Sequence, residues 1–264
     1  KELIKTYTYV SDIPKPWPQP SENGPYQKIL QIMHYDKNMV SYPIEETKKE
    51  NGKVTNSVLY NYGLFNTKNI ELSSIESLKK DPNGIFSVAH FPDDSNIAPF
   101  EKDIDYKETI NYHSYDDKGN PTEVSKTDGT HIVYIWGYNK TQPIAKIENT
   151  TLSDVNLAIS TLNASYNTLE KIQDLSNLDD DNCTDLELCD ERNLRIALNL
   201  LRNALLPKSQ VTTFTYDLLV GITSITDPRG EITYYEYNDF NRLKFIKDAD
   251  GNLLKEYKYQ LRNN

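Results

Sequence analysis

Apolar and polar residues alternate with a period of two over most of the chain, which predicts β-strands. Residues 1–13 show the alternation first, and it returns in residues 42–65. Asn51-Gly52 interrupts this second stretch, and Asn-Gly favours the positive φ angles of a two-residue turn. We therefore predict a β-hairpin there. Residues 26–39 fit either a pair of strands or a short helix.

Tyrosines recur at a nearly constant spacing from about Tyr106 onward. Tyr115 and Tyr138 are 23 positions apart, while Tyr216, Tyr237 and Tyr259 follow one another at 21 and 22. Each interval holds two short alternating stretches and two turn signals. A repeat of about 20 residues of this kind predicts a stacked array of hairpins. Stacking is required because an isolated hairpin buries too little surface to be stable.

The residues between these short strands are typical of tight turns. Asp227-Pro228-Arg229-Gly230 has the type I preferences of Asp first, Pro second and Gly fourth. Asp-Gly pairs supply positive φ where the chain must reverse. The structural turn residues predicted in this way are Gly129, Asp227, Pro228, Gly230, Asp250 and Gly251.

The period changes to 3–4 residues in two stretches between the repeats. Leu152 to Leu175 carries an apolar stripe at helical spacing, with Ser153-Asp154 as a plausible beginning. Leu194 to Leu205 repeats the pattern, and Pro207 ends it. We predict an antiparallel α-helical hairpin inserted into the array. The predicted fold class is mainly β: stacked antiparallel hairpins with this helical insert.

Four regions follow from these patterns. Residues 1–105 are predicted to be an irregular or degenerate β region, 106–150 tyrosine-containing hairpin repeats, 151–210 the helical hairpin, and 211–264 C-terminal repeats. Prolines in residues 14–26 favour polyproline II, which makes this segment a stiff spacer or a ligand for a proline-binding partner.

Composition narrows the class of partner. The 264-residue chain has 19 tyrosines, 37% hydrophobic residues and a mean hydropathy of -0.68, which favours thin β-structure over a thick apolar core. Its net charge of -10 argues against nucleic acid and against anionic membrane surfaces. Apolar runs are too short for a membrane-spanning helix. Because the chain opens directly on a strand-like alternation, we expect a mature product or a fragment.

An acidic segment between the two helical stretches holds the candidate metal and disulfide residues. Cys183 and Cys189 are either a disulfide or two free thiols, and no second pair completes a zinc site. Asp179, Asp181 and Asp185 are a weak Ca²⁺ candidate, because their spacing is not that of an EF-hand. A solvated acidic loop is the favoured interpretation.

No motif for catalysis is present in the sequence. The four histidines belong to no paired motif, and there is neither a Gly-x-Ser-x-Gly nor a Gly-rich phosphate loop. We expect no enzyme activity and no cofactor. Counting alone does not exclude carboxylate chemistry of the glycosidase type.

Three phrases carry a resemblance to a known family. "YDDKGNP", "YIWGYNKTQPIAKIEN" and the block from "TYDLLVG" to "DADGNLL" resemble the YD-repeat (RHS-like) exported surface proteins of Bacteroidota, over residues 106–150 and 211–260. The resemblance implies an exported protein with a sheet wound from hairpins and no catalytic residues in the repeats. It also implies that the chain is the tail of a larger polypeptide or a subunit of an envelope or secretion complex.

The expected function is a non-enzymatic, exported scaffold that binds protein partners at the cell surface. The alternative is a carbohydrate-binding adhesin module, in which aromatic rings on a sheet face stack on sugars. Cross-strand packing is the competing interpretation of the same rings. The candidate interaction residues are Trp136, Tyr138, Tyr234, Tyr235 and Tyr237.

Overall fold

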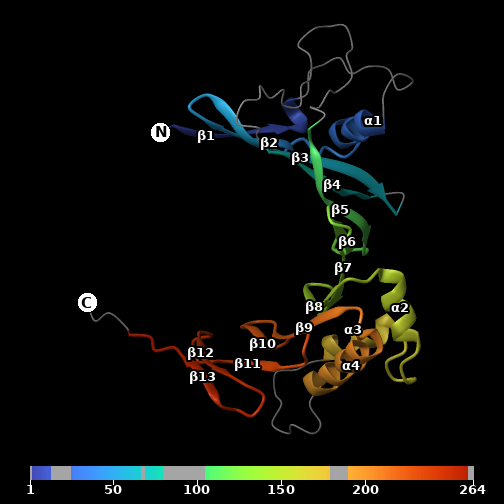
Figure 1. Ribbon diagram of the computed structural model, residues 1–264, viewed down its shortest axis with the longest axis vertical. Helices are drawn as coiled ribbons and strands as arrows, with labels where there is room; N and C mark the ends of the chain where they lie inside the picture. Colours follow the sequence, from blue (N-terminus) through green and yellow to red (C-terminus); the bar gives the residue numbers. More distant parts are fainter. Residues whose placement is uncertain (1, 13–24, 67–68, 80–104, 179–189, 261–264) are drawn as a thin grey trace. The chain divides into compact units, whose positions relative to one another are not determined.

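The computed structural model describes residues 2–12, 25–66, 69–79, 105–178 and 190–260. Thirteen strands form a sheet in which each strand lies beside its neighbours in the sequence, and the pairs with a defined register are antiparallel (Figure 1). The predicted class, a mainly β hairpin array with a helical insert, is confirmed. The chain divides into two compact units: Lys1–Tyr115 with Val124–Gly129, and Asp116–Glu123 with Thr130–Asn264.

The first unit is more regular than its sequence predicted. It contains β1 (Leu3–Tyr9), β2 (Pro43–Glu50), β3 (Lys53–Phe65), β4 (Asn69–Lys79) and β5 (Lys107–Tyr115), with α1 (Pro25–Gln31) and short helical turns at Val10–Asp12 and Ile32–Asp36. Strands β3 and β4, of 13 and 11 residues, are longer than any other described strand. Asn51 and Gly52 form the turn between β2 and β3, with φ of 49° and 78°, which confirms the predicted hairpin. Of the two options for residues 26–39, the helical one is correct.

The second unit holds the helices and most of the repeats. Strand β6 (Pro121–Lys126) is shared between the units, and the rest are β7 (His131–Gly137), β8 (Gln142–Glu148), β9 (Gln210–Asp217), β10 (Gly221–Thr226), β11 (Ile232–Tyr237), β12 (Leu243–Lys247) and β13 (Leu253–Glu256). The helices are α2 (Leu152–Ser160), α3 (Leu169–Leu178) and α4 (Asp190–Leu205). They lie beside β7 to β9 (Figure 1).

An aromatic side chain fixes each hairpin to the strand before it, in a contact that we call an aromatic rung. In every rung the ring donates its O–H or N–H to a backbone carbonyl of the preceding even-numbered strand. The pairs are Tyr62 to Pro43, Tyr115 to Leu72, Trp136 to Pro121, Tyr216 to Pro143, Tyr237 to Ile222 and Tyr259 to Leu243, at 2.7 to 3.1 Å. Trp136, and not Tyr138, therefore continues the repeat that begins at Tyr115.

Five of these acceptor carbonyls stand directly before a β-bulge. The extra residues, which have no partner in the register with the preceding strand, are Ile44, Ser73, Ile144, Thr223 and Lys244. A bulge disrupts the ladder locally and leaves backbone groups without their usual partners. The rung hydroxyl comes from the strand on the other side of the bulged strand. It donates a hydrogen bond to the carbonyl next to the bulge, and so it compensates for the disrupted ladder.

Four turns share one geometry, which begins at Asp116, Asp227, Asn238 or Asp248. Its Oδ1 accepts the N–H groups two and four residues later, at 2.8 to 3.1 Å, and its carbonyl accepts the N–H three residues later. The fourth residue has positive φ and is glycine except at Asn241. We call this the Asx turn. The predicted reversal at Asp250-Gly251 is present, but Asp248 is the residue whose side chain organises it.

The helical insert has three helices where a hairpin of two was predicted. The stripe from Leu152 to Leu175 is broken because Asn163 forms a local turn, in which its Oδ1 accepts the Ser165 N–H at 3.0 Å. Such side-chain bonds compete with helical ones. Thr151, and not Ser153, caps α2: its hydroxyl accepts the Asp154 N–H at 3.2 Å. Helix α4 ends just before Pro207, as predicted.

Burial divides the second unit into two parts. Strands β7 to β9 and the three helices share a core of sixteen buried residues, among them Ile135, Ile144, Leu198 and Leu201, and we call this part the covered sheet. Strands β10 to β13 form the bare sheet: within the described residues 212–260, no apolar side chain is buried. A separate core in the first unit packs Leu30 and Met33 against Leu59. In the described part of the chain, no helix is long and apolar enough to cross a membrane.

Candidate functional site

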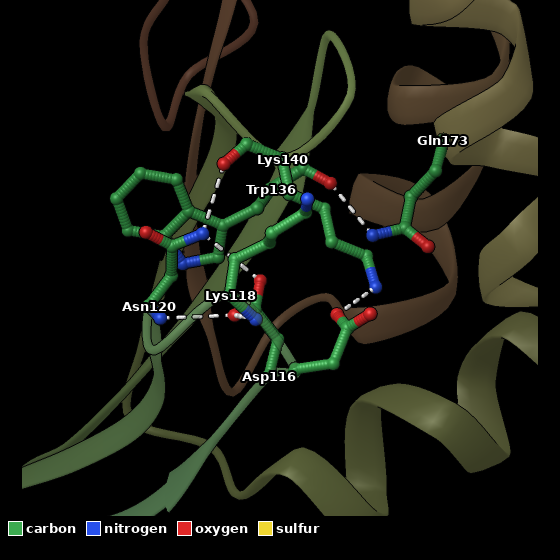
Figure 2. Close-up of polar contacts among 7 residues, drawn as sticks. Asp116, Lys118, Asn120, Trp136, Lys140 and Gln173 are labelled. Atoms are coloured by element: carbon green, nitrogen blue, oxygen red, sulfur yellow. Dashed lines mark hydrogen bonds and ion pairs between the residues drawn. The ribbon is translucent and has the colours of Figure 1, made fainter. Parts of the chain in front are cut away.

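A groove of about 470 Å³ lies beside Trp136 in the second unit, and we call it the tryptophan groove. Three elements form it: the Asx turn at Asp116, the turn from β7 to β8, and helix α3. Figure 2 shows the polar contacts that join them. The lining residues are Asp117, Lys118, Trp136, Gly137, Asn139, Lys140, Glu170, Gln173, Asp174 and Asn177.

The turn from β7 to β8 has an unusual backbone. Tyr138, Asn139 and Lys140 have φ of 49°, 56° and 64°, in the left-handed region. Each such non-glycine residue costs on the order of 1–2 kcal/mol, so the surrounding structure must hold the turn. A function that needs a defined surface benefits from a turn held in this way.

Helix α3 holds this turn from one side. Ser176 Oγ accepts the Tyr138 N–H at 2.8 Å, and Asn177 Oδ1 accepts the Asn139 N–H at 2.6 Å. Gln173 Nε2 donates to the Trp136 carbonyl at 2.6 Å (Figure 2). The helix approaches so closely that a Cβ on Gly137 would lie 2.4 Å from Ser176 Oγ. The glycine of the Trp-Gly-Tyr motif therefore serves packing against the insert.

The other side of the groove is fixed through Lys140. Its ammonium forms an ion pair with Asp117, and its carbonyl accepts the Asn120 Nδ2–H at 2.9 Å (Figure 2). The hydrogen bond and the charge of Lys140 lower the pKa of Asp117. Since Asp117 is held as an anion, it is unsuited to donate a proton.

The groove presents one aromatic ring with amide and carboxylate groups. The Trp136 ring is half-buried, and its N–H is already used by the Pro121 carbonyl at 2.9 Å. Glu170 and Asp174 are exposed on the α3 side. An apolar ring face with polar groups around it suits a ligand that has both apolar and hydroxyl-bearing surfaces.

The structure does not bring the five predicted interaction residues into one surface. Tyr138 is 1% exposed, and its hydroxyl accepts the Tyr216 N–H at 2.9 Å, so its ring belongs to the core. Tyr237 is used in a rung. Tyr234 and Tyr235 are both half-buried, and successive strand residues point to opposite faces. Trp136 alone of the five lines the tryptophan groove.

The predicted disulfide and Ca²⁺ candidates lie outside the described residues: Cys183, Cys189, Asp179, Asp181 and Asp185. Among the residues that the structure does describe, no three His, Cys, Asp or Glu side chains gather as a metal site. A hydroxyl network in the first unit joins Glu45, Ser57 and Tyr106, and all three are buried. Its burial makes it a structural feature of that core.

The sequence interpretation missed the polar face of α3. Gln173, Ser176 and Asn177 recur at helical spacing alongside the apolar stripe, and they carry the contacts that shape the groove. That spacing was visible in the sequence. Their partners were not, because the left-handed turn at Tyr138 is set by tertiary contacts.

No known protein family and no curated protein matches this sequence. Among solved structures, the chain has a match to a chain of "Crystal Structure of TcdB2-TccC3-Cdc42", with 10% identity and a TM-score of 0.35 over 82% of this chain. "Crystal Structure of TcdB2-TccC3 without hypervariable C-terminal region" matches with 10% identity and a TM-score of 0.34 over 82% of this chain. The match covers 10% and 9% of those chains. Function therefore has to be argued from the geometry of this chain.

Proposed function

We propose that the protein is a non-enzymatic, exported scaffold that binds another protein through the bare sheet. It acts as a subunit of a cell-surface or secretion complex, or as the C-terminal part of a larger RHS-like protein. The resemblance of the repeats to exported Bacteroidota proteins supports the cellular setting. Two carboxylates are poorly placed for acid–base catalysis, which fits a binding role: Asp117 is paired with Lys140, and Glu45 is buried.

The observation that carries this proposal is the lack of buried apolar side chains in the described residues 212–260. Large apolar side chains are exposed there instead: Leu218, Leu219, Phe240, Leu253, Leu254 and Tyr259, at 46 to 87%. Exposed large apolar side chains of this kind are available for contact with a protein partner. Strand β13 pairs with β12, and no other described strand pairs with it. A partner could therefore both cover the faces and extend the sheet.

Capture of the native partner tests this proposal with two matched leucines. Leu254 is 59% exposed on the bare sheet, and Leu157 is 67% exposed on α2 of the covered sheet. A tagged chain is expressed in its source cells, cross-linked and purified. We expect a discrete protein to be recovered with the wild type and with Leu157→Glu, and to be lost with Leu254→Glu. Equal recovery with both variants, or no discrete protein with the wild type, contradicts the proposal.

The tryptophan groove supports a second function, carbohydrate binding. Its half-buried ring, carboxylates and amides are suited to the apolar and hydroxyl surfaces of a sugar. Trp136 is a poor site for the test because it also forms a rung. Glu170→Ala changes an exposed groove residue and leaves the rung intact. On a glycan array, we expect wild-type hits that Glu170→Ala weakens, whereas an array without hits rejects this function.

A further inference from the structure

Tyr9, the last residue of β1, has the register position of a rung donor. Tyr9 pairs across to Pro43, and the bulge residue Ile44 follows directly. Pro43 is itself the acceptor of the next rung, which comes from Tyr62. The same arrangement, a donor opposite the acceptor of the next rung and beside a bulge, recurs in four further pairs: Tyr62 with Leu72, Trp136 with Pro143, Tyr216 with Ile222, and Tyr237 with Leu243. Each of these four aromatic residues forms a rung.

The sequence and the ring geometry at Tyr9 are also those of a rung. Ile4–Tyr9 reads IKTYTY and Ile232–Tyr237 reads ITYYEY, so the isoleucine and the last two tyrosines coincide. In both strands an aromatic residue stands two positions before the donor. The rings of Tyr7 and Tyr9 lie with their centroids 6.1 Å apart, and the corresponding ring pairs in β7 and β9 are both separated by 6.5 Å. Strand β1 is therefore built as the second strand of a rung.

Tyr9 differs from the other donors because its acceptor strand is missing from the described sheet. Strand β1 lies at one edge, with β2 on one side and no described strand on the other. The Tyr9 ring is half-buried, and in the part of the chain that the structure describes its hydroxyl forms no hydrogen bond. A donor is thus in place beside an open edge.

The edge of β1 has little protection against pairing. Native proteins commonly block a sheet edge with proline or with charged side chains. Strand β1 has seven residues, no proline and one charged residue, Lys5. Lys5 is paired with Glu46 of β2 at 3.0 Å, so its charge is directed into the sheet. The opposite edge, β13, has four residues of which two are charged, and is the poorer template.

The rungs define the kind of strand that fits this edge. In all six rungs the acceptor lies on an even-numbered strand, and each such strand is enclosed between two others. The described edges of a second copy are β1 and β13, and neither supplies an acceptor in these rungs. The occupant that fits is an extended segment of a different polypeptide with apolar and β-branched residues. A bulge in it leaves one carbonyl available to the Tyr9 hydroxyl.

We propose that the open edge of β1 binds a bulged strand of a different polypeptide, and that this strand accepts a hydrogen bond from the Tyr9 hydroxyl. Strands β10 and β11 give the register: there Thr226 lies opposite Ile232, and the Ile222 carbonyl accepts the rung. Ile4 takes the place of Ile232 in the proposed pair. Since β1 belongs to the first unit, this site is separate from the bare sheet and goes beyond the proposed function.

A peptide copied from β10 tests whether the edge accepts such a strand. The probe is fluorescein-labelled Val-Gly-Ile-Thr-Ser-Ile-Thr-amide, the sequence of residues 220–226, and its binding to the purified 264-residue chain is measured by fluorescence anisotropy. The control peptide carries Ser224→Pro, because proline removes a donor from the ladder. We expect the proline peptide to bind at least about tenfold more weakly. Equal binding of the two peptides overturns the proposal.

Two tyrosine variants of the full chain locate the bound peptide. Tyr9→Phe keeps the ring and removes the rung hydroxyl, so peptide binding should weaken about fivefold. Tyr7→Phe is the matched control on the same strand, where Tyr7 is 43% exposed, and should leave binding unchanged. A peptide bound at β13 would not respond to either variant. Unchanged binding with Tyr9→Phe, or an equal loss with both variants, rejects the site.

Photo-crosslinking in the source cells tests the occupant. With p-benzoylphenylalanine in place of Tyr7, we expect an adduct with a different protein, joined through an extended stretch of apolar and β-branched residues. An adduct with a second copy, an adduct within the same polypeptide, or no adduct overturns the proposal. The adduct should persist when Leu254→Glu disrupts the bare sheet, so this proposal and the proposed function fail separately.

Discussion

The covered sheet and the bare sheet use the same local devices and differ in what lies on them. Both contain aromatic rungs, bulges within an even-numbered strand, and backbone reversals at Asp or Asn. The covered sheet places sixteen residues in one core, whereas no apolar side chain is buried in described residues 212–260. The repeat therefore specifies how strands pair, and the insert decides where a core forms.

The largest effect expected from this comparison is at Gly137. A Cβ there would meet Ser176 Oγ at 2.4 Å and Ile144 Cγ2 at 2.6 Å, inside the covered sheet. We expect Gly137→Ala to lower the free energy of unfolding by about 3 kcal/mol, because overpacking forces the helix or strand to move. Urea denaturation monitored by circular dichroism measures the change.

Gly251 is the control for this substitution. It has a φ of 81° in the bare sheet, with no atom within 4 Å of a built Cβ. Gly251→Ala should cost only about 1 kcal/mol of backbone strain. Equal losses at the two positions would show that the covered sheet is not packed as described.

A leucine pair gives an effect of comparable size. Leu198 is 1% exposed on α4, and Leu254 is 59% exposed on β13. Leu198→Ala should destabilise the chain by about 2–5 kcal/mol, and Leu254→Ala by less than about 0.5 kcal/mol in the absence of a partner. With the partner bound, thermal denaturation should reveal a cost for Leu254→Ala as well. A large cost in the isolated chain would mean that the bare sheet has a core of its own.

The rung hydroxyls should each contribute less. Tyr216→Phe and Tyr237→Phe remove one donor to the carbonyls of Pro143 and Ile222. Each should cost about 1 kcal/mol, measured by chemical denaturation. A loss at Tyr216 but none at Tyr237 would restrict the rung's contribution to the covered sheet.

Alkaline titration examines the same hydroxyl in the wild type. Burial raises the pKa of Tyr216 to about 12, above the value of about 10 expected in the unfolded chain. The unfolded state therefore loses this proton first, and stability falls as pH rises from about 10 to 12. Tyr216→Phe should show a shallower decline over that interval. Parallel declines in the two proteins would contradict the role of this group.

The sequence was sufficient for the parts of the fold that short-range rules determine. Asn51-Gly52 and Asp227-Pro228 mark turns whose φ preferences are local, so both were predicted correctly. The helical insert was found from its period, although Asn163 breaks the first helix through a side-chain bond that the period does not reveal.

The rungs and the candidate sites required the structure. Trp136 occupies a repeat position that the tyrosine count assigned to Tyr138, because an indole N–H can replace a phenol as donor. Bulges are a matter of register between strands, so no single stretch of sequence predicts them. The tryptophan groove joins Trp136 to Gln173 of α3 across 37 positions of sequence, and only the packing of α3 brings them together.

The aromatic rungs have a consequence for how such a chain can change in length. Each rung whose acceptor stands next to a bulge connects three consecutive strands, and it does not depend on more distant strands. A duplicated or deleted pair of strands therefore brings its own bulge, donor and acceptor with it. The array can grow or shrink by whole repeats without a change in the helical insert, so the length of the sheet can change independently of the core that the insert forms.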